Sequence, residues 1–128
     1  MPYVRIELPD TYSADAARSA GDAVHQALVE TMNVPPDDRF QVLARHPEGA
    51  LVITPEYLGV KHDSARAVFV QVVLAPTRSL QQKRAFYAQT AATVAAALDV
   101  SPSDVLIGLV ETHRENWSFG DGVAHYTL

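Results

Sequence analysis

The chain has 128 residues, of which 48% are hydrophobic and 20% charged, and its net charge is −5. These proportions predict a soluble, single globular domain spanning residues 1–128, and they exclude wholesale disorder. The acidic balance and the scattered basic residues argue against a nucleic-acid partner. No apolar run approaches the ~20 residues that cross a bilayer, and no secretory signal is visible. Cysteine is absent, which is compatible with a cytoplasmic location.

Met1 and Pro2 open the chain, and an alternating apolar pattern at Val4, Ile6 and Leu8 predicts a strand directly after them. Initiator methionine is normally removed before a small residue such as proline. Removal would leave Pro2 with a free secondary amine, and an α-amino group has a pKa of about 7.7–8.0. Modest burial or a neighbouring charge would make it a base or an acid at neutral pH. In the simpler interpretation, proline merely starts an edge strand, where its missing N–H costs nothing.

The second half of the chain repeats the first at an offset of 66 residues. The corresponding pairs are Ser13 and Ser79, Val34 and Val100, Pro36 and Pro102, Asp38 and Asp104, and Leu43 and Leu109. Each half, about 2–46 and 66–112, contains a strand, a helix, a Val-x-Pro-x-Asp connector and a return strand. This order is that of a βαβ unit, whose two strands are parallel.

Both helices carry sequence signals at their ends. Ser13 is a good N-cap for the first, and Ser79 with Gln82 forms a capping box for the second. Pro35 and Pro102 cannot continue a helix, so the two helices are expected to end just before them. Apolar residues at helical spacing predict the buried faces, at Ala17, Ala20, Val24, Leu28 and Met32 in the first helix and at Tyr87, Ala91, Val94, Ala95 and Leu98 in the second.

Return strands are predicted at Arg39–Ala44 and Val105–Glu111. The fold class is therefore α/β (α+β): a tandem βαβ repeat forming a four-stranded mixed sheet with two helices on one face. The opposite face of that sheet would lie bare, so self-association is expected. Outside the repeat, we expect a short strand at Ala50–Ile53 and a turn or hairpin at 116–128 around Gly120-Asp121-Gly122.

Pro2 and Asp38 begin parallel strands of the same unit, so both are expected at one edge of the sheet. A carboxylate there would raise the pKa of the amine and could itself move a proton. In the alternative interpretation, Asp38 caps the connector turn, and its repeat partner Asp104 supports that role.

Arg78 directly precedes the N-cap Ser79, where the helix dipole disfavours a cation. A bound anion would resolve this conflict, and an arginine reaching into solvent is the alternative. The histidines form no metal constellation; His25 has only Asp22 as a possible partner and is interpreted as a residue at the boundary of the helix's apolar face. We expect no metal and no cofactor.

Four features together resemble the tautomerase superfamily, and within it the malonate semialdehyde decarboxylase group. They are Pro2, the duplicated βαβ unit, the run from Val34 to Gln41 (VPPDDRFQ), and Trp117-Ser118-Phe119-Gly120. The resemblance covers nearly the whole chain, and the last two motifs are specific to that group. It implies a homotrimer of two βαβ units per subunit, with proline as the catalytic residue.

Carried over by position, the resemblance implies that Pro2 and Asp38 are catalytic and that Arg78 holds a substrate carboxylate. It also implies an apolar wall around the site, formed by Trp117, Phe119 and Tyr126. The sequence departs from the group at Pro76, where a second arginine is expected, and this departure bears on the identity of the substrate.

The expected function is that of an enzyme acting on a small oxo-acid or enol carboxylate. A neutral Pro2 amine would serve keto–enol tautomerisation as a general base. A cationic amine, which Asp38 favours, would serve decarboxylation or hydration, with tautomerisation as a side activity. The alternative is a non-catalytic trimer that binds carboxylates, because retention of Met1 would make the Pro2 nitrogen an amide.

Overall fold

The computed structural model describes all residues from 1 to 128. Its strands and helices alternate as β1 (Tyr3–Pro9), α1 (Ala14–Met32), β2 (Phe40–His46), β3 (Glu56–Tyr57), β4 (Val60–Lys61), β5 (Val68–Leu74), α2 (Leu80–Leu98) and β6 (Val105–Glu111). Short 3-10 turns lie at Pro102–Asp104, Arg114–Asn116 and His125–Thr127. The long elements agree with the predicted repeat, although the first return strand begins one residue later and ends two residues later than predicted.

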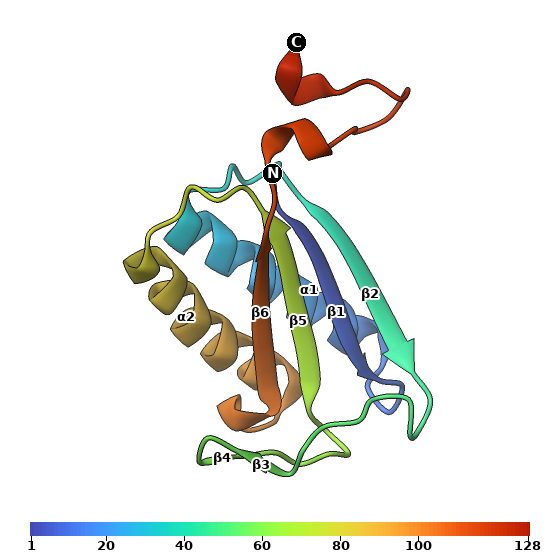
Figure 1. Ribbon diagram of the computed structural model, residues 1–128. Coiled ribbons are helices and arrows are strands. Elements are labelled where there is room, and N and C mark those ends of the chain that lie inside the picture. Colours follow the sequence, from blue (N-terminus) through green and yellow to red (C-terminus); the bar gives the residue numbers. More distant parts are fainter.

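Four strands form a mixed sheet in the order β2-β1-β5-β6. β1 pairs with β2 and β5 with β6 in parallel, while the two halves join through the antiparallel pair β1 and β5. Both helices pack on one face of this sheet, as Figure 1 shows. The predicted fold class is confirmed.

The helices begin at the predicted caps. The Ser13 side chain accepts a hydrogen bond from the N–H of Ala16, and Ser79 and Gln82 form the reciprocal capping box. Each helix ends with a residue in the left-handed conformation, Asn33 at φ 57° and Asp99 at φ 56°. Asparagine and aspartate tolerate this conformation better than most residues, so both helices stop just before their proline-containing connectors.

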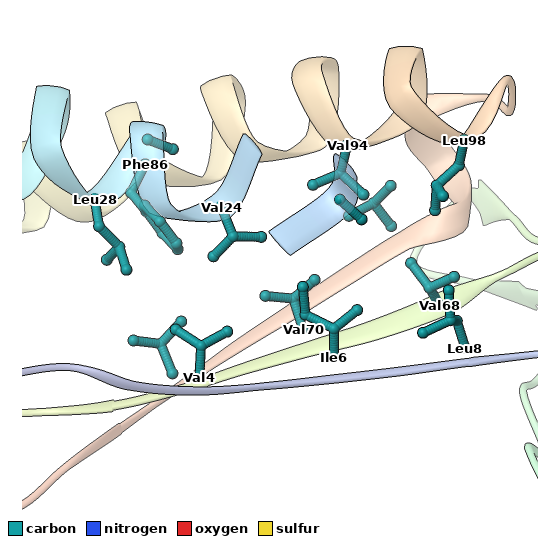
Figure 2. Close-up of a cluster of buried hydrophobic side chains, with 14 of the residues drawn as sticks. Val4, Ile6, Leu8, Val24, Leu28, Val68, Val70, Phe86, Val94 and Leu98 are labelled. Carbon is teal, nitrogen blue, oxygen red and sulfur yellow. The ribbon is translucent and has the colours of Figure 1, made fainter. Parts of the chain in front are cut away.

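The hydrophobic core lies between the helices and the sheet (Figure 2). Inward-facing residues of β1 and β5 meet the predicted stripe of α1, all five residues of which are buried. In α2 the largest buried side chain is Phe86, which lies one residue before the predicted stripe.

The segments outside the repeat differ from their predictions. Ala50–Ile53 forms no strand, because only Ile53 buries its side chain and no strand edge lies beside it. A two-stranded hairpin of β3 and β4 follows instead. The C-terminal segment contains the turn, with positive φ at Gly120, Asp121 and Gly122, but no strand pairing. Its two arms meet through aromatic side chains in place of backbone hydrogen bonds.

The sheet face opposite the helices is open. A hollow of about 540 Å³ lies over the middle of β1, β5 and β6, lined by Arg5, Glu7, Phe69, Val70, Gln71, Leu106, Ile107, Gly108, Leu109 and Val110. Neither helix has the length and apolar character that crossing a membrane would require.

Burial in this core predicts a large contrast between two identical substitutions. Val94→Ala removes two buried carbons and is expected to lower the free energy of unfolding by about 2 kcal/mol. Val52→Ala, at a side chain that is 85% exposed, is expected to change it by less than about 0.5 kcal/mol. Denaturant titration of both variants measures the contrast, and equal effects would contradict the assigned core.

Candidate functional site

The sheet topology brings four separate chain segments to one edge. β1 and β2 begin at this edge, where Tyr3 pairs with Phe40. β5 and β6 end there, because Tyr3 also lies opposite Val73 and Leu74 pairs with Glu111. The residues just outside these strands therefore lie close together at the top of Figure 1, with the C-terminal segment above them.

An open hollow of about 410 Å³ lies at this edge. It is lined by Met1, Pro35, Asp37, Asp38, Phe40, Phe119 and Tyr126. Three residues proposed for the site from sequence, Asp38, Phe119 and Tyr126, therefore line one surface. Pro2 is buried directly after Met1, at the start of β1.

The aromatic side chains form a continuous wall. Trp117 and Phe119 stack nearly parallel at 5.8 Å between ring centroids, and Tyr126 packs edge-on against Phe119 at 5.1 Å. The wall is attached to the sheet through Tyr3, 6.3 Å from Trp117, and Phe40, 5.9 Å from Phe119. Contacts of this geometry stabilise a turn that has no strand pairing of its own.

The Asp38 carboxylate differs from that of its repeat partner, Asp104, in its hydrogen bonding. The Asp104 carboxylate is buried and accepts a hydrogen bond of 2.7 Å from the N–H of Asp63, so it holds the connector in place. The Oδ1 atom of Asp38 is also buried but has no hydrogen-bond partner. Burial of an unsatisfied carboxylate oxygen is costly, and functional sites are where such costs are found. The structural role of Asp104 therefore does not extend to Asp38.

Arg78 lies next to the N-terminus of α2, where the helix dipole disfavours a cation, but its guanidinium binds to the C-terminal end of α1. Its Nε and Nη2 atoms donate to the carbonyl oxygen of Met32 at 3.2 and 3.1 Å, and Nη1 donates to Oγ1 of Thr77. Met32 is the last residue of α1, where the dipole is negative and carbonyl groups lack helical partners. Two of the five N–H groups of Arg78 remain free for a ligand.

The amino terminus lies within a group of charges. Burial lowers the pKa of the Met1 amino group below its ordinary value of 8.0, Asp38 opposes this shift, and Arg78 and Arg114 add to it. Burial and Asp38 also raise the pKa of the Tyr126 phenol. These shifts belong to the primary amine of Met1, one residue before the Pro2 nitrogen for which the sequence favours a cationic form.

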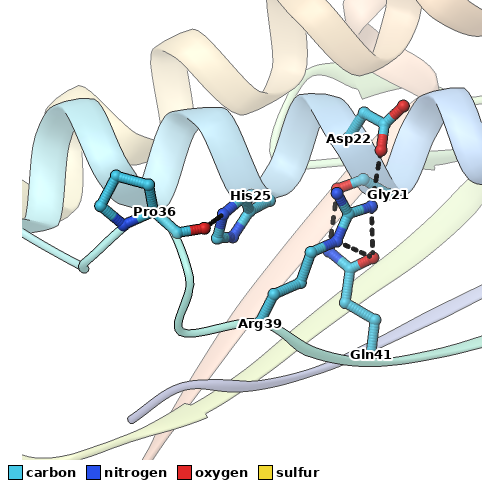
Figure 3. A network of polar contacts seen from close by, with 6 residues as sticks. All are labelled: Gly21, Asp22, His25, Pro36, Arg39 and Gln41. Atoms are coloured by element: carbon cyan, nitrogen blue, oxygen red, sulfur yellow. Dashed lines mark hydrogen bonds and ion pairs between the residues drawn. The ribbon is translucent and has the colours of Figure 1, made fainter.

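Two contacts fasten the loop that carries Asp38 to α1 (Figure 3). The Nε2 atom of His25 lies 2.7 Å from the carbonyl oxygen of Pro36. Asp22 pairs with Nη2 of Arg39 at 2.6 Å, and not with His25 as its position on the helix suggested. The loop is thus anchored on both sides of Asp38.

Gln41 completes this network. Its Nε2 donates to the carbonyl oxygen of Gly21 at 2.8 Å, and its Oε1 accepts from Nε and Nη2 of Arg39. A Cβ atom at Gly21 would lie only 2.7 Å from that Oε1, so glycine gives the amide room to approach the helix. The run from Val34 to Gln41 therefore contains both the carboxylate and two of the side chains that hold it.

Two further arginines, Arg45 and Arg66, have structural partners. Arg45 donates to the carbonyl oxygen of Tyr12, and Arg66 donates to that of Leu98 and lies over the Tyr12 ring. Sequence reasoning missed Arg114, which lies three residues beyond β6. Its position follows from the antiparallel joining of the two halves, because only then does the end of β6 reach the edge where β1 begins.

Comparison with known proteins gives matches over the whole chain. A family model described as tautomerase enzyme matches residues 38–120, and a second with the same description matches residues 2–61. The Bacillus subtilis protein YusQ, named a probable tautomerase, is 33% identical over 97% of both chains. YrdN of the same organism, also named a probable tautomerase, is 28% identical over 98% of this chain and 96% of its own.

Solved structures agree with this result. A malonate semialdehyde decarboxylase from FG41, inhibited by 3-bromopropiolate, is 33% identical with a TM-score of 0.88 and covers 98% of this chain and 94% of its own. A second malonate semialdehyde decarboxylase, described with decarboxylase and hydratase activities, is 32% identical with a TM-score of 0.87, over 98% of this chain and 95% of its own. Native fused 4-OT, at 17% identity and a TM-score of 0.78 over 97% of both chains, shares the fold.

The loop network predicts a local effect on hydrogen exchange. Arg39→Gln removes the ion pair to Asp22 and is expected to speed amide exchange in residues 34–39 by about two- to fivefold, the range of an exposed ion pair. Asp15→Asn, which removes another exposed ion pair of α1, is the control and should leave that segment unchanged. Unchanged exchange in Arg39→Gln would contradict the anchoring role.

The charges around the amino terminus predict opposite pKa shifts in two variants. In protein that retains Met1, Asp38→Asn removes the charge that raises the pKa of the Met1 amine and should lower that pKa further, whereas Arg78→Gln should raise it. The pH dependence of the reaction between the terminal amine and an amine reagent measures both shifts. Asp37→Asn is the matched control, because Asp37 lines the same hollow but does not shift this amine. Shifts of the reverse sign would refute the arrangement.

Proposed function

The chain belongs to the tautomerase superfamily, and we propose that it is an enzyme whose catalytic group is the secondary amine of Pro2, exposed by removal of Met1. The observation that carries this proposal is the setting of the amino terminus. Met1 lines the hollow, and the pKa of its amine, one residue before the Pro2 nitrogen, is lowered by burial and by Arg78 and Arg114, while the unpartnered carboxylate of Asp38 opposes the shift. Such an amine is suited to accept and return protons near neutral pH.

The proposed substrate is a small oxo-acid or its enol. The two free N–H groups of Arg78 would hold the substrate carboxylate. The neutral Pro2 amine would take a proton from the enol hydroxyl or from the carbon next to the carbonyl, and return it to the other position. Trp117 and Phe119 would exclude water from the reacting atoms. The two family models and the probable tautomerases YusQ and YrdN support this reaction as the leading candidate.

Decarboxylation or hydration is the second candidate, and Asp38 is the observation that favours it. Its unpartnered Oδ1 could stabilise a protonated Pro2 amine, which would polarise a carbonyl, or it could orient a water molecule. Two malonate semialdehyde decarboxylases, at 32% and 33% identity, support this possibility. In that case tautomerisation would be a side activity of the same amine.

We also propose that the protein is a homotrimer. The open face of the sheet, with Phe69, Leu106 and Val110 around its hollow, needs a cover that this chain does not supply. Fused 4-OT, which shares the fold, is described as a trimer. A second copy of the chain is the simplest cover for such a face.

The alternative is a non-catalytic member of the family that binds a carboxylate ligand. With Met1 retained, the Pro2 nitrogen is an amide and carries no proton-accepting lone pair. Met1 itself then lines the hollow and takes up part of its surface. In this alternative the protein binds small carboxylates through Arg78 but turns none of them over.

Kinetics of ketonisation of an enol-pyruvate, followed by ultraviolet absorbance, tests the leading candidate. Pro2→Ala is expected to lower kcat/KM by at least about 100-fold, the contribution of a positioned general base. Arg78→Ala is expected to act mainly on KM. In the wild type, kcat/KM should rise with pH through the apparent pKa of the Pro2 amine, because the neutral amine is the active form.

Arg84→Ala, at an exposed arginine in the first turns of α2, is the control and should match the wild type. Equal rates in the wild type, Pro2→Ala and Arg78→Ala would refute the proposed site. A parallel assay of malonate semialdehyde decarboxylation decides between the two candidate reactions.

A further inference from the structure

Arg78 has limited capacity to hold a ligand by itself. Three of its five N–H groups already donate to Met32 and Thr77. Its charge also lies at the C-terminal end of α1, where it compensates the helix dipole. A ligand with two oxygen-bearing groups would therefore need a second cation at the same edge of the sheet.

Arg114 is the cation in a position to fill this role. It lies just after β6, in the turn Arg114–Asn116, and its side chain makes no hydrogen bond or ion pair within the chain. Its guanidinium carbon lies 5.7 Å from the centre of the Tyr126 ring, and Tyr126 lines the hollow. A cation–π contact fixes the position of the guanidinium without using its N–H groups. Its five N–H donors therefore have no partner within the chain and lie beside a ring that lines the hollow.

No acidic side chain forms an ion pair with Arg114. Glu111, three residues before Arg114 and the last residue of β6, pairs with Lys83 at 2.8 Å. Asp38, which lines the hollow, makes no ion pair either. One engaged guanidinium, that of Arg78, and one free guanidinium, that of Arg114, thus act on the amino terminus.

We propose that Arg114 is a specificity-determining residue of this site, which binds the second oxygen-bearing group of the substrate while Arg78 holds the carboxylate. This inference rests on the proposed function and names its substrate class: acids with a further carboxylate, or with a carbonyl that becomes an enolate during the reaction. A guanidinium suits both, because its donor fork matches a carboxylate and its charge stabilises an enolate oxygen. Monocarboxylates without such a group gain nothing from Arg114.

The electrostatics of the site agree with this placement. Arg114 lowers the pKa of the amino terminus and opposes the upward shift at the Tyr126 phenol, so its charge is felt on both sides of the hollow. The other charged groups that act on the amine are Asp38 and Arg78. A bound anion would partly screen both guanidinium groups.

Calorimetry with malonate and propionate tests the inference, because the two ligands share a three-carbon chain and differ in the second carboxylate. Arg114→Gln is expected to weaken malonate binding about tenfold, the worth of one charge-assisted hydrogen bond, and propionate binding less than twofold. Arg114→Lys should fall between the wild type and Arg114→Gln for malonate. Arg78→Gln should weaken both ligands, and the control Arg84→Gln neither.

The inference is overturned if Arg114→Gln binds malonate as tightly as the wild type does, or if the wild type shows no measurable preference for malonate over propionate. Its failure is distinguishable from failure of the proposed function. Turnover that depends on Pro2, together with unchanged malonate binding in Arg114→Gln, rejects only the role of Arg114. Malonate binding that depends on Arg114, without turnover that depends on Pro2, rejects only the catalytic proposal.

Discussion

The antiparallel pairing of β1 with β5 is the constraint on which the rest of the molecule depends. Each βαβ half alone would place only its own strand starts at one edge. Because the halves join in opposite directions, the starts of β1 and β2 share an edge with the ends of β5 and β6. This arrangement collects an amino terminus, a carboxylate and two guanidinium groups within one region, at the same edge as the aromatic wall.

The two halves use equivalent elements for different purposes at that edge. The Asp104 carboxylate accepts a hydrogen bond from the N–H of Asp63, whereas the buried Oδ1 atom of Asp38 has no hydrogen-bond partner. The free carboxylate is tolerable because His25 and Arg39 hold its loop against α1 from either side. Stability supplied by the network thus offsets the cost of an unsatisfied group, as is typical of sites shaped for function.

Local signals predicted the fold well because helix caps, apolar spacing and connectors are properties of neighbouring residues. The capping box at Ser79 and the limits of β6 are the clearest cases. Long-range relations were harder. Arg114 becomes visible only once the register between halves is known, and the Met32 contact of Arg78 depends on how two helices pack. Ala50–Ile53 had strand composition but no neighbouring edge to pair with.

Catalysis at this edge requires the free amine of Pro2, and the intact mass of the purified protein shows whether that amine exists. The amine exists only if Met1 is removed, because the Pro2 nitrogen is otherwise an amide. We predict a mass corresponding to residues 2–128, with proline as the first residue released by N-terminal sequencing. A mass that includes Met1 in the active, purified protein would contradict the claim.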